Sequence, residues 1–217
     1  MTAFLLCIAA IIAYIFGMMP WPVIVSRFIF HKDCRSKHGK INPSYGEFQQ
    51  RYGIKGLLIL IAFDVVFASL ACVIGGALLS SRDLVTVGRI FGAYCYLLGC
   101  CFPFLSLYMG RRGIVQAGIM MFFIDWRVAL ICIAIFVIVA IFTKYVVVAG
   151  LAAAILSAMF IWIFGGTGLE GTLVLICAIV LCVRHFDSIK RLLSGSEHQL
   201  GGIIPKRRSR PEDEDEY

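Results

Sequence analysis

Long apolar runs dominate the chain, and short polar stretches separate them. The first run covers residues 2–30 and is interrupted by Pro20-Trp21-Pro22. Several runs approach the roughly 20 residues that an α-helix needs to cross the hydrocarbon core of a bilayer. The pattern therefore predicts membrane-spanning helices at seven ranges: 2–30, 57–79, 87–108, 114–124, 128–143, 146–164 and 172–183.

Two neighbouring runs, 114–124 and 128–143, are short for full crossings. We expect one of them to be tilted, shielded by protein or only half-crossing. The predicted fold class is an all-α integral membrane protein of about seven transmembrane helices, some short, with cytoplasmic re-entrant loops. Residues 1–200 form a single polytopic membrane domain in this prediction. Residues 201–217, which end in an acidic run, form a disordered cytoplasmic tail.

Composition supports a membrane protein and excludes an ordinary soluble domain. Hydrophobic residues make up 60% of the 217 residues, and charged residues only 15%. The nine cysteines lie mostly inside apolar runs without C-x-x-C spacing, so we interpret them as small buried residues. The sequence predicts no metal and no cofactor. Trp21, Trp126 and Trp162 lie near the ends of runs and are expected to anchor the helices at the membrane interface.

The basic residues are distributed asymmetrically between the two sides of the predicted membrane. Seven crossings place alternate connections on opposite sides, and all but three of the 20 Lys and Arg then fall on one side. The exceptions are Arg82, Arg89 and Arg127. Because cytoplasmic loops carry the excess of Lys and Arg, the N-terminus is predicted outside and the C-terminus in the cytoplasm. The predicted location is the plasma membrane.

The polar segments 31–55, 99–118 and 184–197 all fall on the predicted cytoplasmic side. In the second of them, Gly110-Arg111-Arg112-Gly113 places two positive charges between two glycines. Guanidinium groups suit a phosphate or carboxylate, and glycines let the backbone approach a ligand closely. One interpretation is a shared site for a phosphorylated ligand at headgroup depth. The alternative is a set of loops that only fix topology and attract anionic lipid. The glycines and prolines of these loops favour the site.

Two segments of the chain carry a family resemblance. The segment from Arg184 to Glu197 is similar to R-H-x-x-N-I-x-R-L-x-x-G-x-E, with Ser188 in place of the asparagine. The segment 99–116 resembles G-H-x-F-P-x-F-L-x-F-x-G-G-K-G-V-A-T at five positions: Gly99, Phe102, Pro103, Gly110 and Gly113. With these motifs the chain resembles the bacterial acyl-phosphate-dependent glycerol-3-phosphate acyltransferases, the PlsY family.

The resemblance implies transfer of an acyl chain from acyl phosphate to glycerol 3-phosphate, or to a related phosphorylated acceptor, at the cytoplasmic face. Membrane lipids are further partners, and nucleic acid is not. The residues that it implies for catalysis and acceptor orientation are Asn42, His185 and Ser188. Those implied for phosphate binding are Arg35, Lys40, Arg111, Arg112 and Arg191. Those implied for structural support are Asp64 and Glu197.

Several positions depart from the family pattern, and they leave the function open between two classes. Lys40, Cys100, Gln116, Val147 and Ser188 stand where the family has other polar residues. The favoured hypothesis is a membrane acyltransferase of phospholipid synthesis. The alternative is a non-catalytic paralogue that binds acyl phosphate or anionic lipid as a regulator or scaffold. A transporter is a weaker option, because the spans offer few polar groups for a path across the membrane.

Asp64 lies well inside the predicted second span. A charged side chain at the bilayer centre costs roughly 2.5–3.5 kcal/mol when it has no partner. We therefore expect Asp64 to face the bundle or approach the surface, and to pair with a basic residue from the cytoplasmic side. A structural ion pair and a catalytic role are both open.

Overall fold

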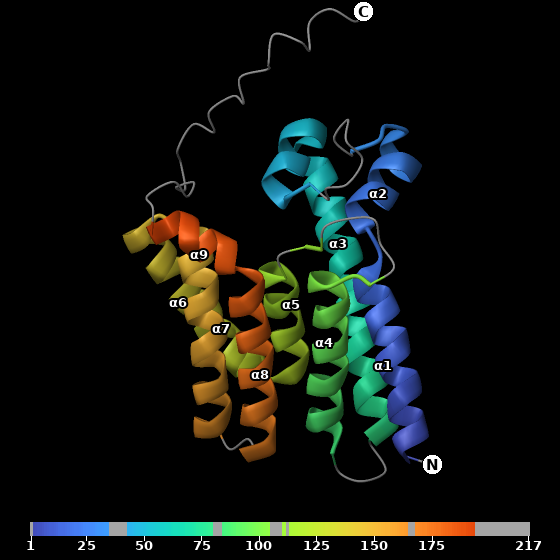
Figure 1. The fold of residues 1–217 in the computed structure, drawn as a ribbon, viewed down its shortest axis with the longest axis vertical. Helices are drawn as coiled ribbons and strands as arrows, with labels where there is room; N and C mark the ends of the chain where they lie inside the picture. Colours follow the sequence, from blue (N-terminus) through green and yellow to red (C-terminus); the bar gives the residue numbers. More distant parts are fainter. Residues whose placement is uncertain are drawn as a thin grey trace, which may run out of the picture.

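The structure is a computed structural model that describes residues 2–34, 43–79, 84–104, 110–111, 113–164 and 168–193. In these ranges the chain forms α-helices and no β-strand, which confirms the predicted all-α class (Figure 1). The helices are α1 (Thr2–Met18), α2 (Trp21–Phe30), α3 (Tyr45–Leu79), α4 (Val85–Cys101), α5 (Ile114–Ile124), α6 (Trp126–Thr143), α7 (Val146–Ile163), α8 (Gly168–Arg184) and α9 (Phe186–Leu193).

The helices fit a membrane protein by length and composition. Among the described residues, α3, α6 and α7 are each long and apolar enough to cross a bilayer. Two bent pairs bring this number to as many as five: α1 with α2, bent by 57°, and α8 with α9, bent by 59°. The remaining α4 and α5 are apolar but shorter. Each of the seven predicted runs therefore contains at least one apolar helix.

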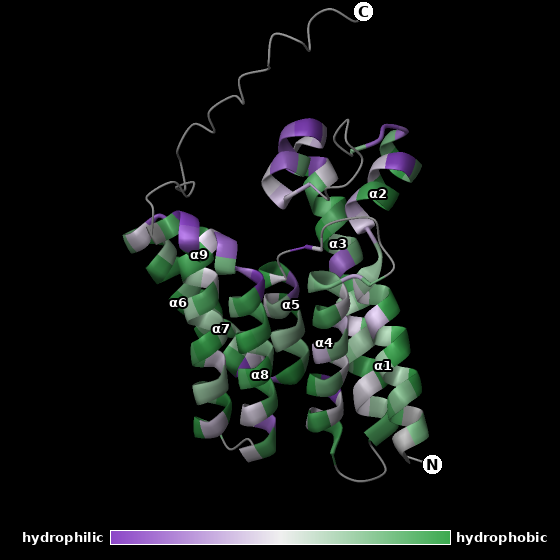
Figure 2. Cartoon of the chain, viewed as in Figure 1, coloured by the Kyte–Doolittle hydropathy of each residue, from purple (hydrophilic) through white to green (hydrophobic). Residues whose placement is uncertain are grey.

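The bundle has two halves with α5 between them. α1, α3 and α4 pack together, and α6, α7 and α8 pack together, while α5 contacts helices of both halves (Figure 1). Figure 2 shows that hydrophobic residues cover the flanks of the bundle. Hydrophilic residues gather at the end that carries α2, the first turns of α3, and α9, opposite the start of α1. The hydrophilic residues of the described chain are therefore concentrated at one end of the bundle.

Close helix contacts in the first half depend on glycine. A Cβ atom added to Gly75 of α3 would collide with the backbone of Gly88 in α4, and one added to Gly88 would collide with Gly75. Small residues let two helix backbones approach in this way, which is the usual solution inside a membrane. Helices α3 and α4, which pack closely in this way, both contribute to the polar site described below.

Two predicted boundaries of the apolar runs differ from the helices. α3 begins at Tyr45, twelve positions before the apolar run at 57, because its first turns are polar and lie beyond the apolar part of the helix. A non-helical residue, Gly53 with φ 71° and ψ −174°, separates these turns from the rest. α4 ends at Cys101, before the predicted limit at 108. Pro103 is the second residue after this end, and proline has no N–H to continue a helix.

The interface-anchor prediction is wrong for Trp21. Its side chain is only 5% exposed, and its ring stacks on Phe67 at a centroid distance of 3.9 Å. The bend between α1 and α2 turns this residue inward, so that it packs against α3. Trp126 and Trp162 are 60% and 47% exposed.

Candidate functional site

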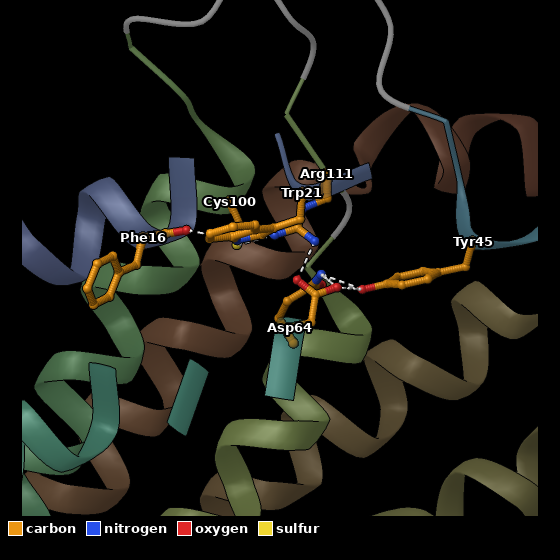
Figure 3. A network of polar contacts seen from close by, with 7 residues as sticks. Phe16, Trp21, Tyr45, Asp64, Cys100 and Arg111 are labelled. Atoms are coloured by element: carbon orange, nitrogen blue, oxygen red, sulfur yellow. Dashed lines mark hydrogen bonds and ion pairs between the residues drawn. The ribbon is translucent and has the colours of Figure 1, made fainter. Parts of the chain in front are cut away.

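A buried ion pair lies at the centre of the polar end of the bundle. Asp64 of α3 has no exposed surface, and its Oδ1 lies 2.5 Å from Nη1 of Arg111 (Figure 3). The pairing predicted for Asp64 is therefore present. Arg111 comes from the segment between α4 and α5 and is itself 9% exposed. Removing either member would leave an uncompensated charge in a low-dielectric interior.

Arg111 is held in place by its own backbone and by α4. Its N–H donates to the carbonyl oxygen of Cys100 at 2.8 Å, and its Nη2 lies 3.6 Å from the Cys100 Sγ. Burial opposes the charge on Arg111, but the neighbouring Cys100 sulfur and the carboxylate of Asp64 raise the pKa of the guanidinium well above its ordinary value. Arg111 thus stays a cation directed at a carboxylate. Its predicted role in phosphate binding stays a prediction.

Two neutral side chains complete the surroundings of the Asp64 carboxylate. The Tyr45 hydroxyl donates to Asp64 Oδ2 at 2.5 Å. Nε2 of Gln116, in α5, donates to the Tyr45 oxygen at 2.6 Å and to Asp64 Oδ2 at 3.3 Å. The neighbouring carboxylate fixes the orientation of the amide, because only its NH₂ group can donate. We call Asp64, Arg111, Tyr45 and Gln116 the carboxylate cluster.

Sequence analysis did not assign Tyr45 or Gln116 to the site. Gln116 carries a signal, since it is the one strongly polar residue within the apolar run 114–124. A buried amide needs hydrogen-bond partners, so a polar neighbour was to be expected. Tyr45 carries no comparable signal, because a tyrosine beside a polar loop is common at a membrane interface.

Gly110 and Gly113, which lie on either side of Arg111, allow the backbone to approach residues of α4 and α8 closely. A Cβ on Gly110 would collide with the carbonyl oxygen of Cys101. Gly113 has φ 81°, and a Cβ there would lie 3.0 Å from side-chain carbons of both Leu97 and Leu181. At the end of α8, Nη2 of Arg184 donates to the Gly110 carbonyl oxygen at 2.5 Å. The turn 110–113 is thus enclosed by α4 and α8.

Of the predicted site residues that follow α8, His185 and Ser188 are buried, and Arg191 is exposed. His185 has no exposed surface, and its Nδ1 lies 2.8 Å from the carbonyl oxygen of Leu181. A carbonyl oxygen only accepts, so Nδ1 carries the proton and Nε2 is the basic nitrogen of the neutral ring. Ser188 is 4% exposed and accepts a hydrogen bond from Nη2 of Arg191 at 2.9 Å. Both contacts are local to α8 and α9, and Arg184 joins this part of the chain to Gly110.

Five predicted site residues lie outside the described residues: Arg35, Lys40, Asn42, Arg112 and Glu197. Their roles stay predictions. The described parts of the three polar segments are nevertheless linked. Tyr45 of the first segment bonds to Gln116 of the second, and Arg184 of the third bonds to Gly110. Among the described residues, no group of three or more His, Cys, Asp or Glu is placed to hold a metal ion.

An apolar groove lies on the other side of α5. Its volume is about 260 Å³, and residues of α4, α5, α6, α7 and α8 line it. Leu97 and Leu181 line the groove and also border the space beside Gly113. The groove therefore lies next to Gly113, and Ile114 is its first lining residue on α5. Its lining residues are Ala93, Leu97, Ile114, Val115, Ala117, Gly118, Met120, Met121, Ile124, Ala129, Cys132, Ile133, Phe136, Gly150, Ala153, Ala154, Ser157, Val174, Cys177, Ala178 and Leu181.

Comparison with known proteins finds one family along nearly the whole chain. Residues 7–195 match the profile of a family described as Glycerol-3-phosphate acyltransferase. Similar proteins of this name include one from Cupriavidus taiwanensis, 26% identical over 192 residues, which cover 88% of this chain and 95% of the relative. Another, from Bradyrhizobium diazoefficiens, is 29% identical over 197 residues, covering 89% and 94%.

Solved structures show the same fold at lower identity. The lysophosphatidic acid form of PlsY, an integral membrane glycerol 3-phosphate acyltransferase, is 19% identical, with a TM-score of 0.75 over 89% of this chain and 94% of that one. The glycerol 3-phosphate form is 20% identical, with a TM-score of 0.74 over 90% and 96%. At these identities the match establishes the helix arrangement.

Proposed function

Because this chain belongs to the glycerol-3-phosphate acyltransferase family, we propose that it is a membrane acyltransferase of phospholipid synthesis. In this proposal it moves an acyl chain from acyl phosphate to glycerol 3-phosphate, or to a related phosphorylated acceptor, at the cytoplasmic face. The observation that carries the proposal is the position of the turn 110–113. This turn meets the carboxylate cluster on one side, and on the other side it lies next to Leu97 and Leu181, which line the apolar groove.

The substrates match the two sides of this turn. An acyl phosphate joins a dianionic head to a long apolar tail. The head suits Arg112, which is predicted to bind phosphate, and the basic residues Arg35, Lys40 and Arg191 of the neighbouring segments. The tail suits the groove, because burial of each methylene is worth about 0.8 kcal/mol. A bound acyl phosphate would place its reactive carbonyl between the two regions.

The proposed reaction needs little besides positioning and charge neutralisation. The acceptor hydroxyl oxygen attacks the acyl carbonyl carbon and forms the ester bond. The bond between that carbon and the phosphate oxygen breaks, and phosphate leaves with the electron pair. The hydroxyl proton passes to a base, and we propose Nε2 of His185 for this role. Asn42 and Ser188 are proposed to orient the acceptor, and Glu197 to support the basic residues.

A specific observation favours the non-catalytic alternative. Arg111 stands where the family resemblance has a glycine, and its guanidinium is directed into the carboxylate cluster. This side chain occupies space beside the turn that a glycine would leave open. Under this alternative, binding of the phosphorylated substrates is retained, and turnover with acyl phosphate and glycerol 3-phosphate is slow or absent.

Binding and turnover measured on the same preparation test the proposal. Purified protein in lipid nanodiscs should bind acyl phosphate or glycerol 3-phosphate. Arg112→Ala should weaken binding by roughly tenfold or more, since a hydrogen bond to a charged group contributes about 1.5–3 kcal/mol. Binding without any release of phosphate would favour the scaffold or regulator. Brisk formation of lysophosphatidic acid would exclude it. Failure to bind either compound would contradict the acyltransferase proposal.

The orientation of the chain is a separate proposal. We infer that the N-terminus is outside and the C-terminus cytoplasmic, because the basic loops then follow the positive-inside rule. Reporter fusions or cysteine accessibility should place Lys40, Arg112 and Arg207 in the cytoplasm. The same methods should place Asp83 and Glu170 outside. A tail found outside would overturn the orientation and the cytoplasmic site together.

A further inference from the structure

The α5 wall of the apolar groove has a gap at Gly118. Val115 and Phe122, one turn to either side along α5, are 39% and 44% exposed, and Gly118 is exposed between them. Val115 and Gly118 both line the groove. A Cβ added to Gly118 would have no atom within 4 Å. The groove therefore reaches the outer surface of α5, which faces lipid in a membrane.

Small residues on α7 provide the room in the wall across from α5. Gly150, Ala153, Ala154 and Ser157 follow the helical spacing of one face, and all four line the groove. Ser157 is the only hydroxyl among the lining side chains, and it donates to the Ala154 carbonyl oxygen within its own helix at 2.6 Å. The lining thus offers no free polar group to water. Apolar cavities of about 150 Å³ already stay dry and bind small hydrocarbons.

We propose that Gly118 is a specificity-determining residue, which lets the groove accept acyl chains long enough to pass it. This inference rests on the proposed function, because the groove lies next to the turn 110–113, where the phosphate head is proposed to bind. Gly118 follows Ile114 by four residues, or about 6 Å along the helix. An acetyl group ends before this point, whereas a palmitoyl chain continues past Gly118 towards the bilayer.

A larger side chain at this position should exclude long chains without disturbing the fold. The open space at Gly118 accommodates new atoms, and leucine is a better helix former than glycine. The new side chain would occupy the gap and part of the groove. Each methylene displaced from apolar contact weakens binding by roughly fourfold. The phosphate head is not affected, because the cluster and the turn lie at the end of α5.

The test compares Gly118→Leu with the unchanged protein, both in lipid nanodiscs. Binding is measured for palmitoyl phosphate, acetyl phosphate and glycerol 3-phosphate. We expect palmitoyl phosphate to bind about tenfold more weakly, or worse, from two or more displaced methylenes. Binding of the other two compounds should stay unchanged. The matched control is Gly168→Leu at the start of α8, where an added Cβ also meets nothing within 4 Å and the residue does not line this groove.

The outcomes separate this inference from the proposed function. If the unchanged protein binds no phosphorylated compound, the proposed function is wrong and the inference falls with it. If it binds palmitoyl phosphate and Gly118→Leu binds it equally well, only the inference is wrong. An equal loss for acetyl and palmitoyl phosphate also overturns it. Should Gly118→Leu fail to fold, Gly118→Ala is the second variant. It is expected to weaken binding of palmitoyl phosphate selectively but by a smaller factor, and the absence of any selective weakening overturns the inference.

Discussion

The two faces of α5 present opposite kinds of site. On the face towards α3, Gln116 belongs to a cluster in which each polar contact has a defined partner and distance. On the face towards α6, α7 and α8, Gly118 and its neighbours enclose a groove that exists because side-chain volume is missing. The cluster is specified by the groups that are present. The groove is specified by the groups that are absent.

This difference predicts opposite responses to mutation. Removing atoms from the cluster leaves charges or donors without partners, so truncation is costly there. Adding atoms to the groove fills empty space, so enlargement should change ligand binding more than stability. Elsewhere in a packed interior, both changes are destabilising. Four measurements of stability test this difference between the two faces of α5.

The largest effect is expected for Asp64→Leu. The substitution leaves Arg111 buried without its counter-ion, which costs about 3–5 kcal/mol. The measurement is the free energy of unfolding in detergent micelles. The control is Asp33→Ala, because Asp33 forms an ion pair with Arg27 in which the two side chains are 37% and 53% exposed. An exposed pair contributes about 0–1 kcal/mol. Equal losses for both variants would contradict a buried pair at Asp64.

A second substitution should recover much of this loss. Arg111→Met in the Asp64→Leu background replaces the whole ion pair by apolar groups, and such replacements are often neutral or stabilising. We expect the double variant to be more stable than Asp64→Leu alone by about 2 kcal/mol or more. Strictly additive losses in this double-mutant cycle would show that the two side chains do not interact.

A smaller loss is expected for Tyr45→Phe. The change removes the hydroxyl that donates to Asp64 and accepts from Gln116. Hydrogen bonds to charged groups contribute about 1.5–3 kcal/mol, so the loss in unfolding free energy should lie near the lower end of this range. Tyr52→Phe is the control, because the Tyr52 hydroxyl makes an exposed 3.3 Å contact with the Lys32 carbonyl oxygen. A larger loss at Tyr52 would argue against the cluster.

The sequence predicts the helices well because hydrophobic runs are local. The seven apolar runs and the pairing of Asp64 with a base from the polar side could both be read from residue types. The identity of the base could not, because Arg111 is 47 residues away and Arg112 beside it carries the same charge. The first turns of α3 were missed because they are helical but polar.

The groove was not predictable from the sequence. Small residues such as Ala153 and Gly118 occur throughout an apolar chain, and most of them simply allow close helix packing, as Gly75 does. Whether a small residue makes a contact or a cavity depends on which helix faces it. That relation is set by the packing of five helices and leaves no local pattern.

The smallest effect on stability is expected for Ala154→Leu, which enlarges a side chain that lines the groove. Ala154 of α7 lines the groove, so the added atoms enter empty space and gain apolar contact. We expect the unfolding free energy to change by less than about 1 kcal/mol, since volume added to a void avoids the strain of overpacking. Ala158→Leu is the matched control on the same helix. Ala158 is 1% exposed and packed in a cluster with Ile90, Val128 and Val174, and Ala158 itself does not line the groove. Overpacking there should cost about 1–3 kcal/mol. If both variants lose the same stability, the space beside α5 is not available to a side chain, and the contrast between the two faces fails.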